Sequence, residues 1–374
     1  MITIGVDARH LSEKNSGIKT YLVNLLHQLI KKTKDTHYWY VYCPYKLDKG
    51  LFAYENVKIL DMPISTKVKG FHVVFSQAII PIYAFFHKVD LIWFPANRAA
   101  LFLPKKTARV LSIHDLVWIK HPETMKCLGF FLDKLFMVRS AKIADIVTTV
   151  SNSAFNEIIM AGISEVEKTV VVFNGGSVPA IIDNDDVYDD FFLFVGTLEP
   201  RKNLVRLLYA YKSLPLKCRQ KFKLIVAGSE GWGKANLRDL ISKLDLVEYV
   251  KVLGYVDCVT LSKLYKNAQF LVMPSLYEGF GLPLIEAMSY GTPVLTSNNS
   301  SMPEVSGKAG LLVDAFDVSS IAYGLQEMIT NDERRSSLAR NARRNASRYS
   351  WDISANKMII VFEKALKLRN NKFL

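Results

Sequence analysis

Residues 273–297 read MPSLYEGFGLPLIEAMSYGTPVLTS, and this stretch decides the fold class of the chain. An apolar segment ends at Pro274, and a glycine-rich loop follows it. A helix is predicted from Leu282, because the next residue is a proline and proline is favoured in a first helical turn. Gly291 and Pro293 end that helix and begin the next apolar segment. A strand, a helix and a second strand in this order indicate a parallel α/β unit.

The same alternation of short apolar runs and helical patterns continues along the whole chain. It predicts a doubly wound α/β fold with two Rossmann-like domains, residues 1–178 and 191–354. An acidic stretch headed by Pro179 is typical of a linker between them. A long helix over about 355–374 could pack back on the first domain. The predicted strands are ITIGVDA, YWYVYC, DLIWFP, ARVLSIHD and DIVTTVS, then FFLFVGT, KFKLIVAG, VKVLGYV, QFLVMPS and TPVLTS.

Composition narrows the class of function. The 374 residues carry a formal net charge of +13, which suits anionic lipid, phosphorylated ligands or nucleic acid. No zinc-finger, recognition-helix or RNA-binding signature accompanies the charge, so no nucleic-acid partner is predicted. The 4 cysteines lie far apart without a C-x-x-C pair, which argues against a zinc site and suits a reducing, cytoplasmic compartment. The first residues, MITIGVDARH, do not resemble a secretory signal.

Two apolar runs leave open a contact with a membrane. FHVVFSQAIIPIYAFF, residues 71–86, is too short to span a bilayer comfortably and contains Pro81. It is either a buried helix or a segment at a membrane interface. KCLGFFLDKLFMVR, residues 126–139, is either a core helix or a peripheral attachment to anionic lipid at the inner face of the plasma membrane.

The glycine-rich loop of the opening stretch has the chemistry of a ligand site. Gly279 and Gly281 allow the backbone to approach a ligand closely, and the free N–H groups of the helix from Leu282 favour an anion. Glu278 and Glu286 can both face one cleft at the carboxyl ends of the strands, where such sheets bind ligands. Carboxylates accept hydrogen bonds from sugar hydroxyls. Together these groups predict a site for a ligand that carries both a sugar and a phosphate.

The complete segment YEGFGLPLIEAMSYGTPV, with Glu278 and Glu286 eight positions apart, resembles the signature of retaining GT-B glycosyltransferases of family 4. The resemblance implies a hexosyltransferase with two Rossmann-like domains facing across a cleft and with no metal or other cofactor. Further stretches match this family in the expected order: NSGIKTYLVNLL (15–26), SIHDL (112–116), SNSAFNEI (151–158), FVGTLEPRKNL (194–204) and SSMPEVSGKAGLLVDAFD (300–317).

The resemblance implies roles for single residues of the glycine-rich segment. Glu286 would accept hydrogen bonds from the ribose of a nucleotide-sugar donor. Glu278, with the backbone beside it, would hold hydroxyls of the transferred sugar and is one of the predicted catalytic residues. The predicted donor-binding residues here are Glu278, Gly279, Phe280, Gly281, Leu282 and Glu286.

Arg201 and Lys202 are predicted to lie against the diphosphate of the donor. Glycosyl transfer produces a diphosphate leaving group, and fixed cations at that place stabilise the transition state. Pro200 and Asn203 suggest a tight turn that holds both cations near the start of a helix. Lys202 is therefore predicted to be catalytic.

Four further residues follow from the resemblance. His114, at the end of the run ARVLSI, would contact the donor sugar or the acceptor and is predicted to be catalytic. Gly17 would let its loop approach the diphosphate. Backbone at Tyr255 and Val256 would contact the nucleotide base.

Two other patterns suggest different chemistry. GSEGWGK, residues 228–234, follows a predicted strand as a phosphate-binding P-loop would, but Ala235 stands where a P-loop needs Ser or Thr. We therefore interpret it as a turn after the second strand of the second domain. Asp183, Asn184 and Asp185 form a D-x-D triplet that could hold Mn²⁺ against a diphosphate, but their acidic surroundings favour a solvated linker.

The sequence as a whole predicts transfer of a sugar, with mannose from GDP-mannose favoured, to a hydroxyl of a lipid-linked oligosaccharide in cell-surface polysaccharide biosynthesis. A UDP-sugar or dTDP-sugar donor stays open, as does a GT-B-like nucleotide-sugar epimerase or hydrolase. A sugar-binding protein without catalysis is a further alternative. An NAD-dependent oxidoreductase is disfavoured, because no G-x-G-x-x-G follows the first predicted strand.

Overall fold

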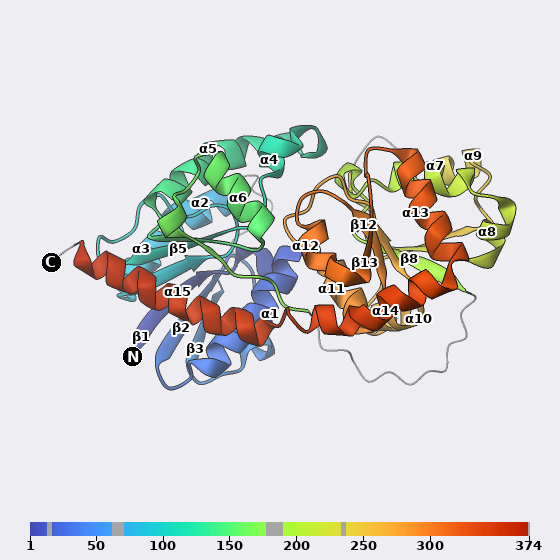
Figure 1. Cartoon of the computed structure of the whole chain (residues 1–374). Coiled ribbons are helices and arrows are strands. Elements are labelled where there is room, and N and C mark those ends of the chain that lie inside the picture. The colour runs from blue at the N-terminus through green and yellow to red at the C-terminus, as the bar shows by residue number, and fades with distance from the viewer. Residues whose placement is uncertain (13–16, 62–70, 177–189, 233–236, 373–374) are drawn as a thin grey trace. The chain divides into compact units, whose positions relative to one another are not determined.

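The computed structural model describes residues 1–12, 17–61, 71–176, 190–232 and 237–372. They form two compact units, each a parallel β-sheet with helices on both faces (Figure 1). This arrangement confirms the predicted doubly wound α/β class. Unit 1 contains Met1–Ile119, Met125–Gly175 and Trp351–Leu374, and unit 2 contains Lys120–Thr124 and Gly176–Ser350.

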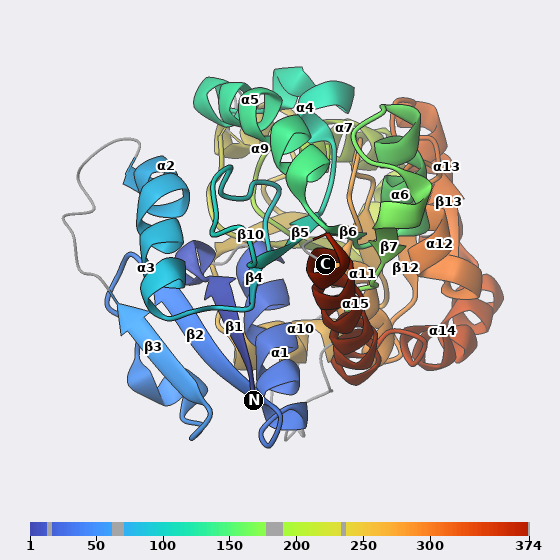
Figure 2. The same ribbon diagram turned by 90° about the vertical axis from the view of Figure 1, so that its left-hand side faces the viewer.

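Unit 1 is built on a 7-stranded parallel sheet in the order β3-β2-β1-β4-β5-β6-β7 (Figure 2). Every strand predicted in this half is confirmed, because each is an apolar run that the sheet buries. The short strands β3 and β7 at the two edges were not predicted. The strands are β1 (Ile2–Asp7), β2 (His37–Cys43), β3 (Val57–Asp61), β4 (Leu91–Phe94), β5 (Ala108–Ile113), β6 (Ile146–Thr149) and β7 (Thr169–Val171).

Helices α1 (Gly17–Lys32) and α15 (Trp351–Asn371) lie side by side on one face of this sheet (Figure 2). The Phe362 ring of α15 contacts the rings of Trp39 and Trp93 on the strands. The opposite face is covered by α3 (Ile80–Phe86), α5 (Cys127–Ile143) and α6 (Asn152–Met160), which share one buried cluster with the strands. The short helix α4 spans Val117–Lys120.

The apolar run 71–86 forms one bent helical segment with two different sides. Helix α2 (Phe71–Val74) leads through a π-turn, Phe75–Ile79, into α3. Phe75, Ile80 and Ala84 are buried against the sheet, whereas Ile82, Phe85 and Phe86 are exposed. The prediction of a buried helix is therefore correct for the inner side and wrong for the outer side.

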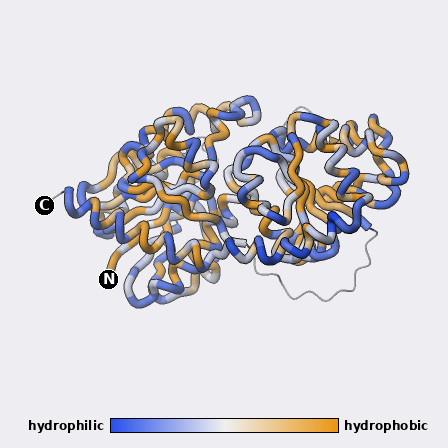
Figure 3. The backbone as a smooth tube through the Cα atoms, viewed as in Figure 1, coloured by the Kyte–Doolittle hydropathy of each residue, from blue (hydrophilic) through white to orange (hydrophobic). Residues whose placement is uncertain are grey.

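Unit 2 is built on a 6-stranded parallel sheet in the order β10-β9-β8-β11-β12-β13. Its apolar strands stand out against more hydrophilic outer turns in Figure 3. All the strands predicted in this half are confirmed, and only the edge strand β13 was not predicted. The strands are β8 (Phe191–Val195), β9 (Lys223–Ala227), β10 (Val250–Gly254), β11 (Leu271–Met273), β12 (Val294–Ser297) and β13 (Gly310–Val313).

One face of this second sheet packs against α7 (Leu204–Ser213), α8 (Leu216–Lys221), α9 (Leu237–Lys243) and α13 (Val318–Thr330). The other face packs against α10 (Cys258–Asn267), α11 (Leu282–Ser289) and α12 (Met302–Ser306). Helix α14 (Asp332–Ala346) contacts both α11 and α13. Short 3₁₀ turns lie at Arg9–Ser12, Lys49–Phe52, Pro122–Thr124, Val166–Lys168, Pro200–Lys202 and Gly307–Ala309.

The long C-terminal helix belongs to unit 1. Helix α15 begins at Trp351, and the Ser354 hydroxyl donates a hydrogen bond of 2.6 Å to the carbonyl oxygen of Phe173. The predicted linker, with its D-x-D triplet, lies outside the described residues. Among the helices of the described ranges, none combines the length and the apolar character needed to cross a bilayer.

Candidate functional site

A tight turn after β8 carries the two predicted cations. Pro200–Lys202 forms one 3₁₀ turn, and Asn203 adopts a left-handed backbone with φ of 62° before α7 begins. The buried Asn203 amide donates hydrogen bonds of 2.9 Å to Pro274 O and 2.7 Å to Ala315 O. One side chain therefore joins the turn to the loops that follow β11 and β13.

The glycine-rich loop after β11 lies against that turn. The Leu276 N–H donates to Arg201 O, and the Arg201 guanidinium donates back to Tyr277 O. Gly281 has φ of 95°, and a Cβ there would come within 2.6 Å of the Met302 side chain. Both the conformation and the space thus require glycine at this position. Helix α11 then starts at Leu282, as predicted.

The turn and the loop together bring four charged side chains into one group, Glu199, Arg201, Lys202 and Glu278, which we call the Glu278 cluster. Lys202 Nζ lies 2.6 Å from Glu278 Oε1, and Arg201 Nη1 lies 2.8 Å from Glu278 Oε2. Arg201 Nη2 also pairs with Glu199. Two cations and two carboxylates balance, so the cluster is neutral when all four are ionised. The structure thus joins two groups that the sequence assigned separately to the diphosphate and to the sugar.

The ionisation of Glu278 is set by these neighbours. Burial by itself would raise the pKa of this carboxyl group, but Arg201 and Lys202 outweigh burial and hold the pKa at about 2. The carboxylate is therefore ionised at neutral pH. An ionised carboxylate accepts hydrogen bonds and cannot donate them, which suits a group that holds sugar hydroxyls.

Serine side chains fix the loop from its other side. Ser301 Oγ donates to the carbonyl oxygens of both Glu278 and Phe280, at 3.0 and 3.1 Å. The Glu278 N–H donates to Ser300 Oγ at 3.1 Å. The Phe280 ring is buried and contacts the Tyr349 ring edge to face, so it packs inside unit 2.

Glu286 lies on α11 and has a different partner. Its Oε2 accepts a 2.7 Å hydrogen bond from the Tyr265 hydroxyl on α10. Burial raises the pKa of Glu286, and the hydrogen bond from Tyr265 partly opposes that effect. The Glu286 carboxylate is therefore held by a neutral donor, whereas the Glu278 carboxylate is held by two cations.

The remaining predicted positions of unit 2 lie at the same carboxyl edge of the sheet. Tyr255 is exposed and Val256 half-buried, directly after β10. Gly228 follows β9, and a Cβ there would lie 1.9 Å from Gly196 O, so the β9 turn packs closely against the β8 turn. This confirms that GSEGWGK begins as the turn after the second strand. Its Gly233 and Lys234 lie outside the described residues.

Two predicted residues belong to unit 1. His114 directly follows β5, and its Nε2 lies 2.6 Å from the carbonyl oxygen of Pro95. Its ring also packs edge to face on Tyr21, and burial lowers its pKa, so the ring is neutral at neutral pH. Gly17 is the first residue of α1 and is exposed. The contacts of both residues with a ligand stay predictions.

Sequence reasoning missed Glu199, which completes the charge balance of the Glu278 cluster. It expected Asn203 in the tight turn, but not the two hydrogen bonds by which the Asn203 amide holds the neighbouring loops. A signal for Asn203 was present, because asparagine is enriched at left-handed positions and here directly precedes a helix. Nothing in the sequence pattern showed that Glu199 faces Arg201.

Residues 166–345, which contain the Glu278 cluster and Glu286, match the family model described as "Glycosyl transferases group 1". This part of the chain is a glycosyltransferase group 1 domain. The match confirms that the YEGFGLPLIEAM segment belongs to a glycosyltransferase, whereas family 4 and the retaining mechanism stay predictions. Within the glycosyltransferase domain, the matched residues include the whole of the unit 2 sheet and the loops at its carboxyl edge.

Two relatives come from Escherichia coli. The chain is 40% identical over 165 residues to "O-antigen chain mannosyltransferase B", an alignment that covers 44% of this chain and 43% of the relative. It is 29% identical over 290 residues to "Serotype-specific mannosyltransferase WbdA", covering 71% of this chain and 34% of that protein. The alignments thus span less than half the length of either relative.

Solved structures extend the likeness beyond the domain. Sucrose-phosphate synthase from Thermosynechococcus elongatus superposes with a TM-score of 0.77 at 17% identity, covering 97% of this chain and 99% of that one. Similarity at this level of identity shows the fold alone. It confirms the predicted GT-B fold class, with a parallel sheet in each of two units.

Proposed function

We propose that the chain is a metal-independent, retaining hexosyltransferase of family 4 that moves mannose from GDP-mannose to a hydroxyl of an oligosaccharide acceptor. The observation that carries this proposal is the Glu278 cluster, in which a carboxylate and two cations meet at the carboxyl edge of a parallel sheet within a glycosyltransferase group 1 domain. That edge is where sheets of this kind bind ligands.

Each member of the cluster has one task in the proposed reaction. The ionised Glu278 carboxylate accepts hydrogen bonds from hydroxyls of the transferred sugar. Lys202 has three donor hydrogens, so it can keep its contact with Glu278 while it binds a phosphate oxygen. Arg201 is fixed by Tyr277 O, Glu199 and Glu278, so its delocalised positive charge is held in one place beside the proposed diphosphate.

The proposed chemical step needs no further acid or base from the protein. The bond from sugar C1 to the diphosphate oxygen breaks, and the acceptor oxygen bonds to C1 on the same face. The acceptor proton passes to the departing phosphate. Negative charge grows on the diphosphate in the transition state, so the fixed cations Lys202 and Arg201 stabilise that state more than the bound donor.

Mannose is assigned from the relatives. The names of the two Escherichia coli relatives describe mannosyltransferases, one of them of the O-antigen chain. We therefore propose GDP-mannose as donor and a lipid-linked oligosaccharide of cell-surface polysaccharide synthesis as acceptor. The sugar transfer would take place on the cytoplasmic side of the membrane. In this proposal Glu286 holds the ribose, Tyr255 and Val256 lie against the base, and His114 of unit 1 contacts the sugar or the acceptor.

The test is a panel of nucleotide sugars that includes GDP-mannose, UDP-glucose, UDP-N-acetylglucosamine and a dTDP-deoxysugar. Each is scored by the rise in the thermal midpoint of unfolding and by release of the nucleoside diphosphate in the presence of oligosaccharide acceptors. We expect GDP-mannose to give the largest rise and sugar to appear on the acceptor with retained anomeric configuration, in the presence of a chelator. Free mannose or an epimerised nucleotide sugar as the main product would overturn the proposal.

A further inference from the structure

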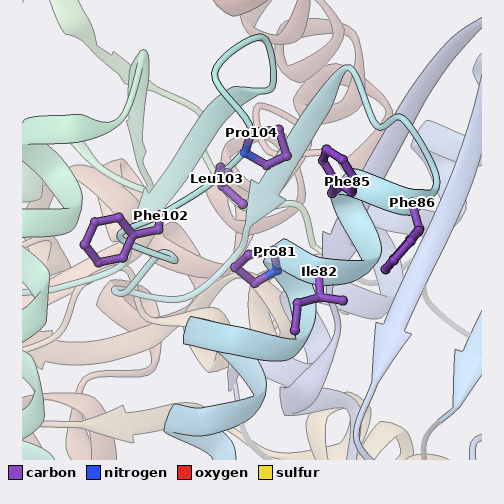
Figure 4. Close-up of a pocket in the computed structure, with 7 residues that line it drawn as sticks. All are labelled: Pro81, Ile82, Phe85, Phe86, Phe102, Leu103 and Pro104. Atoms are coloured by element: carbon purple, nitrogen blue, oxygen red, sulfur yellow. The ribbon is translucent and has the colours of Figure 1, made fainter.

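An apolar groove lies on unit 1, between α3 and the segment that joins β4 to β5. Its volume is about 330 Å³, and it is lined by Pro81, Ile82, Phe85, Phe86, Phe102, Leu103 and Pro104 (Figure 4). The first four of these belong to α3, and the last three belong to the segment between β4 and β5. Two separate parts of the chain therefore meet to form one apolar surface, which we call the α3 groove.

The aromatic rings of the α3 groove are unusually open to solvent. Phe85 is 67% exposed, Phe86 73% and Phe102 79%, and Ile82 beside them is also exposed. The inner side of the same helix is buried on the sheet through Ile80 and Ala84, so the outer rings are not needed to hold α3 in place. A contiguous exposed apolar surface of this kind marks an interaction site.

Three of the charged side chains that neighbour the groove residues in the chain are lysines. Lys88 follows Phe86 closely in the chain, and Lys105 and Lys106 follow Pro104 directly; all three side chains are exposed. The segments 71–90 and 98–107 contain one acidic residue, Asp90, whose carboxylate accepts a hydrogen bond from the Thr3 N–H. Exposed lysines thus neighbour the apolar groove residues in the chain, and we call Lys88, Lys105 and Lys106 the lysine rim.

We propose that the α3 groove docks unit 1 on an anionic lipid bilayer. Phenylalanine rings enter the boundary between headgroups and acyl chains, while the lysine ammonium groups stay at the level of the anionic headgroups. The proline-containing helix lies in the plane of the surface and does not cross the bilayer. This assigns the membrane contact to 81–88 and 102–106 rather than to the run 126–139.

The lysine rim favours a bilayer over a second copy of the chain. In a two-fold symmetric dimer the same patch faces itself, so the lysines of the two rims would lie close together and repel. An anionic surface instead attracts every one of them. Helix α5 also exposes Leu128, Phe131 and Leu135, but all three lie on one helix, whereas two separate segments form the α3 groove.

The experiment compares two matched triple variants of the full chain. The groove variant carries Phe85→Ser, Phe86→Ser and Phe102→Ser, and the control carries Leu128→Ser, Phe131→Ser and Leu135→Ser on α5. Binding is measured by co-sedimentation with phosphatidylcholine vesicles, with and without phosphatidylglycerol. Circular dichroism and thermal unfolding check that both variants fold. A third variant, Lys88→Glu with Lys105→Glu and Lys106→Glu, tests the same surface through charge if the groove variant fails to fold.

We expect the unaltered chain to bind vesicles with phosphatidylglycerol at least about ten-fold more tightly than vesicles without it, and less tightly as salt is raised. The groove or rim variant should lose at least about ten-fold, and the α5 variant less than about three-fold. Any other pattern overturns the proposal. So does a dimer in light scattering that the groove variant converts to a monomer, because a second copy would then cover the rings.

This inference does not depend on the proposed reaction. The groove residues lie in unit 1 and the Glu278 cluster in unit 2, so vesicle binding and nucleotide-sugar turnover are measured on different parts of the chain. Failure of one test leaves the other result intact.

Discussion

Lys202 Nζ lies 2.6 Å from Glu278 Oε1, so a cation from the turn after β8 and a carboxylate from the loop after β11 form one partly buried ion pair. The two residues are 76 positions apart in the chain, and only the parallel sheet brings them together. A donor that binds here finds Lys202 and Glu278 already paired with each other. Its phosphate and hydroxyl oxygens must therefore share these two side chains with the existing ion pair.

Removal of the lysine tests the catalytic assignment directly. We expect Lys202→Ala to lower turnover by at least about a hundred-fold, because a fixed cation at the leaving group is lost. The measurement is release of nucleoside diphosphate from the donor found in the panel. Lys212→Ala is the matched control, because Lys212 is a more exposed lysine of α7 that pairs with the exposed Asp245. Turnover within a factor of about three of the unaltered chain in Lys202→Ala would refute the assignment.

The depressed pKa of Glu278 predicts how stability depends on pH. Its pKa is about 2 in the folded protein, against an ordinary value of 4.5, so the ionised carboxylate stabilises the folded state above the ordinary pKa. The shift corresponds to about 3 kcal/mol at neutral pH, which is lost as pH falls through the range between the two values. Glu278→Gln lacks this contribution.

Urea unfolding from neutral pH down to about pH 3 measures the effect. The free energy of unfolding of the unaltered chain should fall more steeply than that of Glu278→Gln, and the two curves should converge toward low pH. Parallel curves over the whole range would show that Glu278 does not titrate as the structure indicates.

Asn203 is expected to support both stability and turnover. Asn203→Ala removes two buried hydrogen bonds and puts alanine, which tolerates a left-handed backbone less well than asparagine, at this position. The two effects together should cost about 2–4 kcal/mol of the free energy of unfolding. Asp245→Ala is the control, because Asp245 also has a positive φ, of 50°, but is exposed. That control should lose about 1 kcal/mol and keep full turnover. Equal losses in the two variants would show that the backbone conformation alone matters.

Tyr265→Phe should change how donor binding depends on pH. The Tyr265 hydroxyl lowers the pKa of Glu286 against the effect of burial, so its removal raises that pKa further. If Glu286 holds the ribose as a carboxylate, the KM for the donor rises when acid protonates Glu286. In Tyr265→Phe this rise should begin at a higher pH than in the unaltered chain, with kcat changed little.

Tyr323→Phe provides the comparison for that experiment, because Tyr323 is exposed on α13. Its pH profile should overlay that of the unaltered chain. An unchanged pH profile in Tyr265→Phe would show that the ionisation of Glu286 does not affect donor binding.

Much of the fold follows from the sequence because the central strands are almost wholly buried. Runs such as LIWF and ARVLSI contain no position facing solvent, so they stand out as apolar segments. The strand Val57–Asp61 was missed because it lies at a sheet edge and is only partly buried. Its sequence VKILD therefore carries no such signal.

The site was predictable in its location but not in its contacts. Strand order places the loops after β8 and β11 at one edge, so Lys202 and Glu278 could be expected to lie near each other. The sequence gives no information on side-chain direction, which is why the pairing of Arg201 with Glu199 and of Glu286 with Tyr265 was not predicted. For the same reason the run 71–86 stayed open between a buried helix and a segment at a membrane interface, since hydrophobicity alone cannot show which side of a helix faces the sheet.

Helix α15 covers part of one face of the unit 1 sheet. In the chain, however, all the strands of the unit 2 sheet lie between β7 and α15. The glycosyltransferase group 1 domain is therefore an insert within its neighbour and not a simple second half. A chimera that exchanges donor specificity should join at Gly175/Gly176 and again at Ser350/Trp351, keeping the host's own last helix. With a single junction, the last helix would come from the other parent. Trp39 and Trp93 of the host would then pack against a helix whose side chains do not match them.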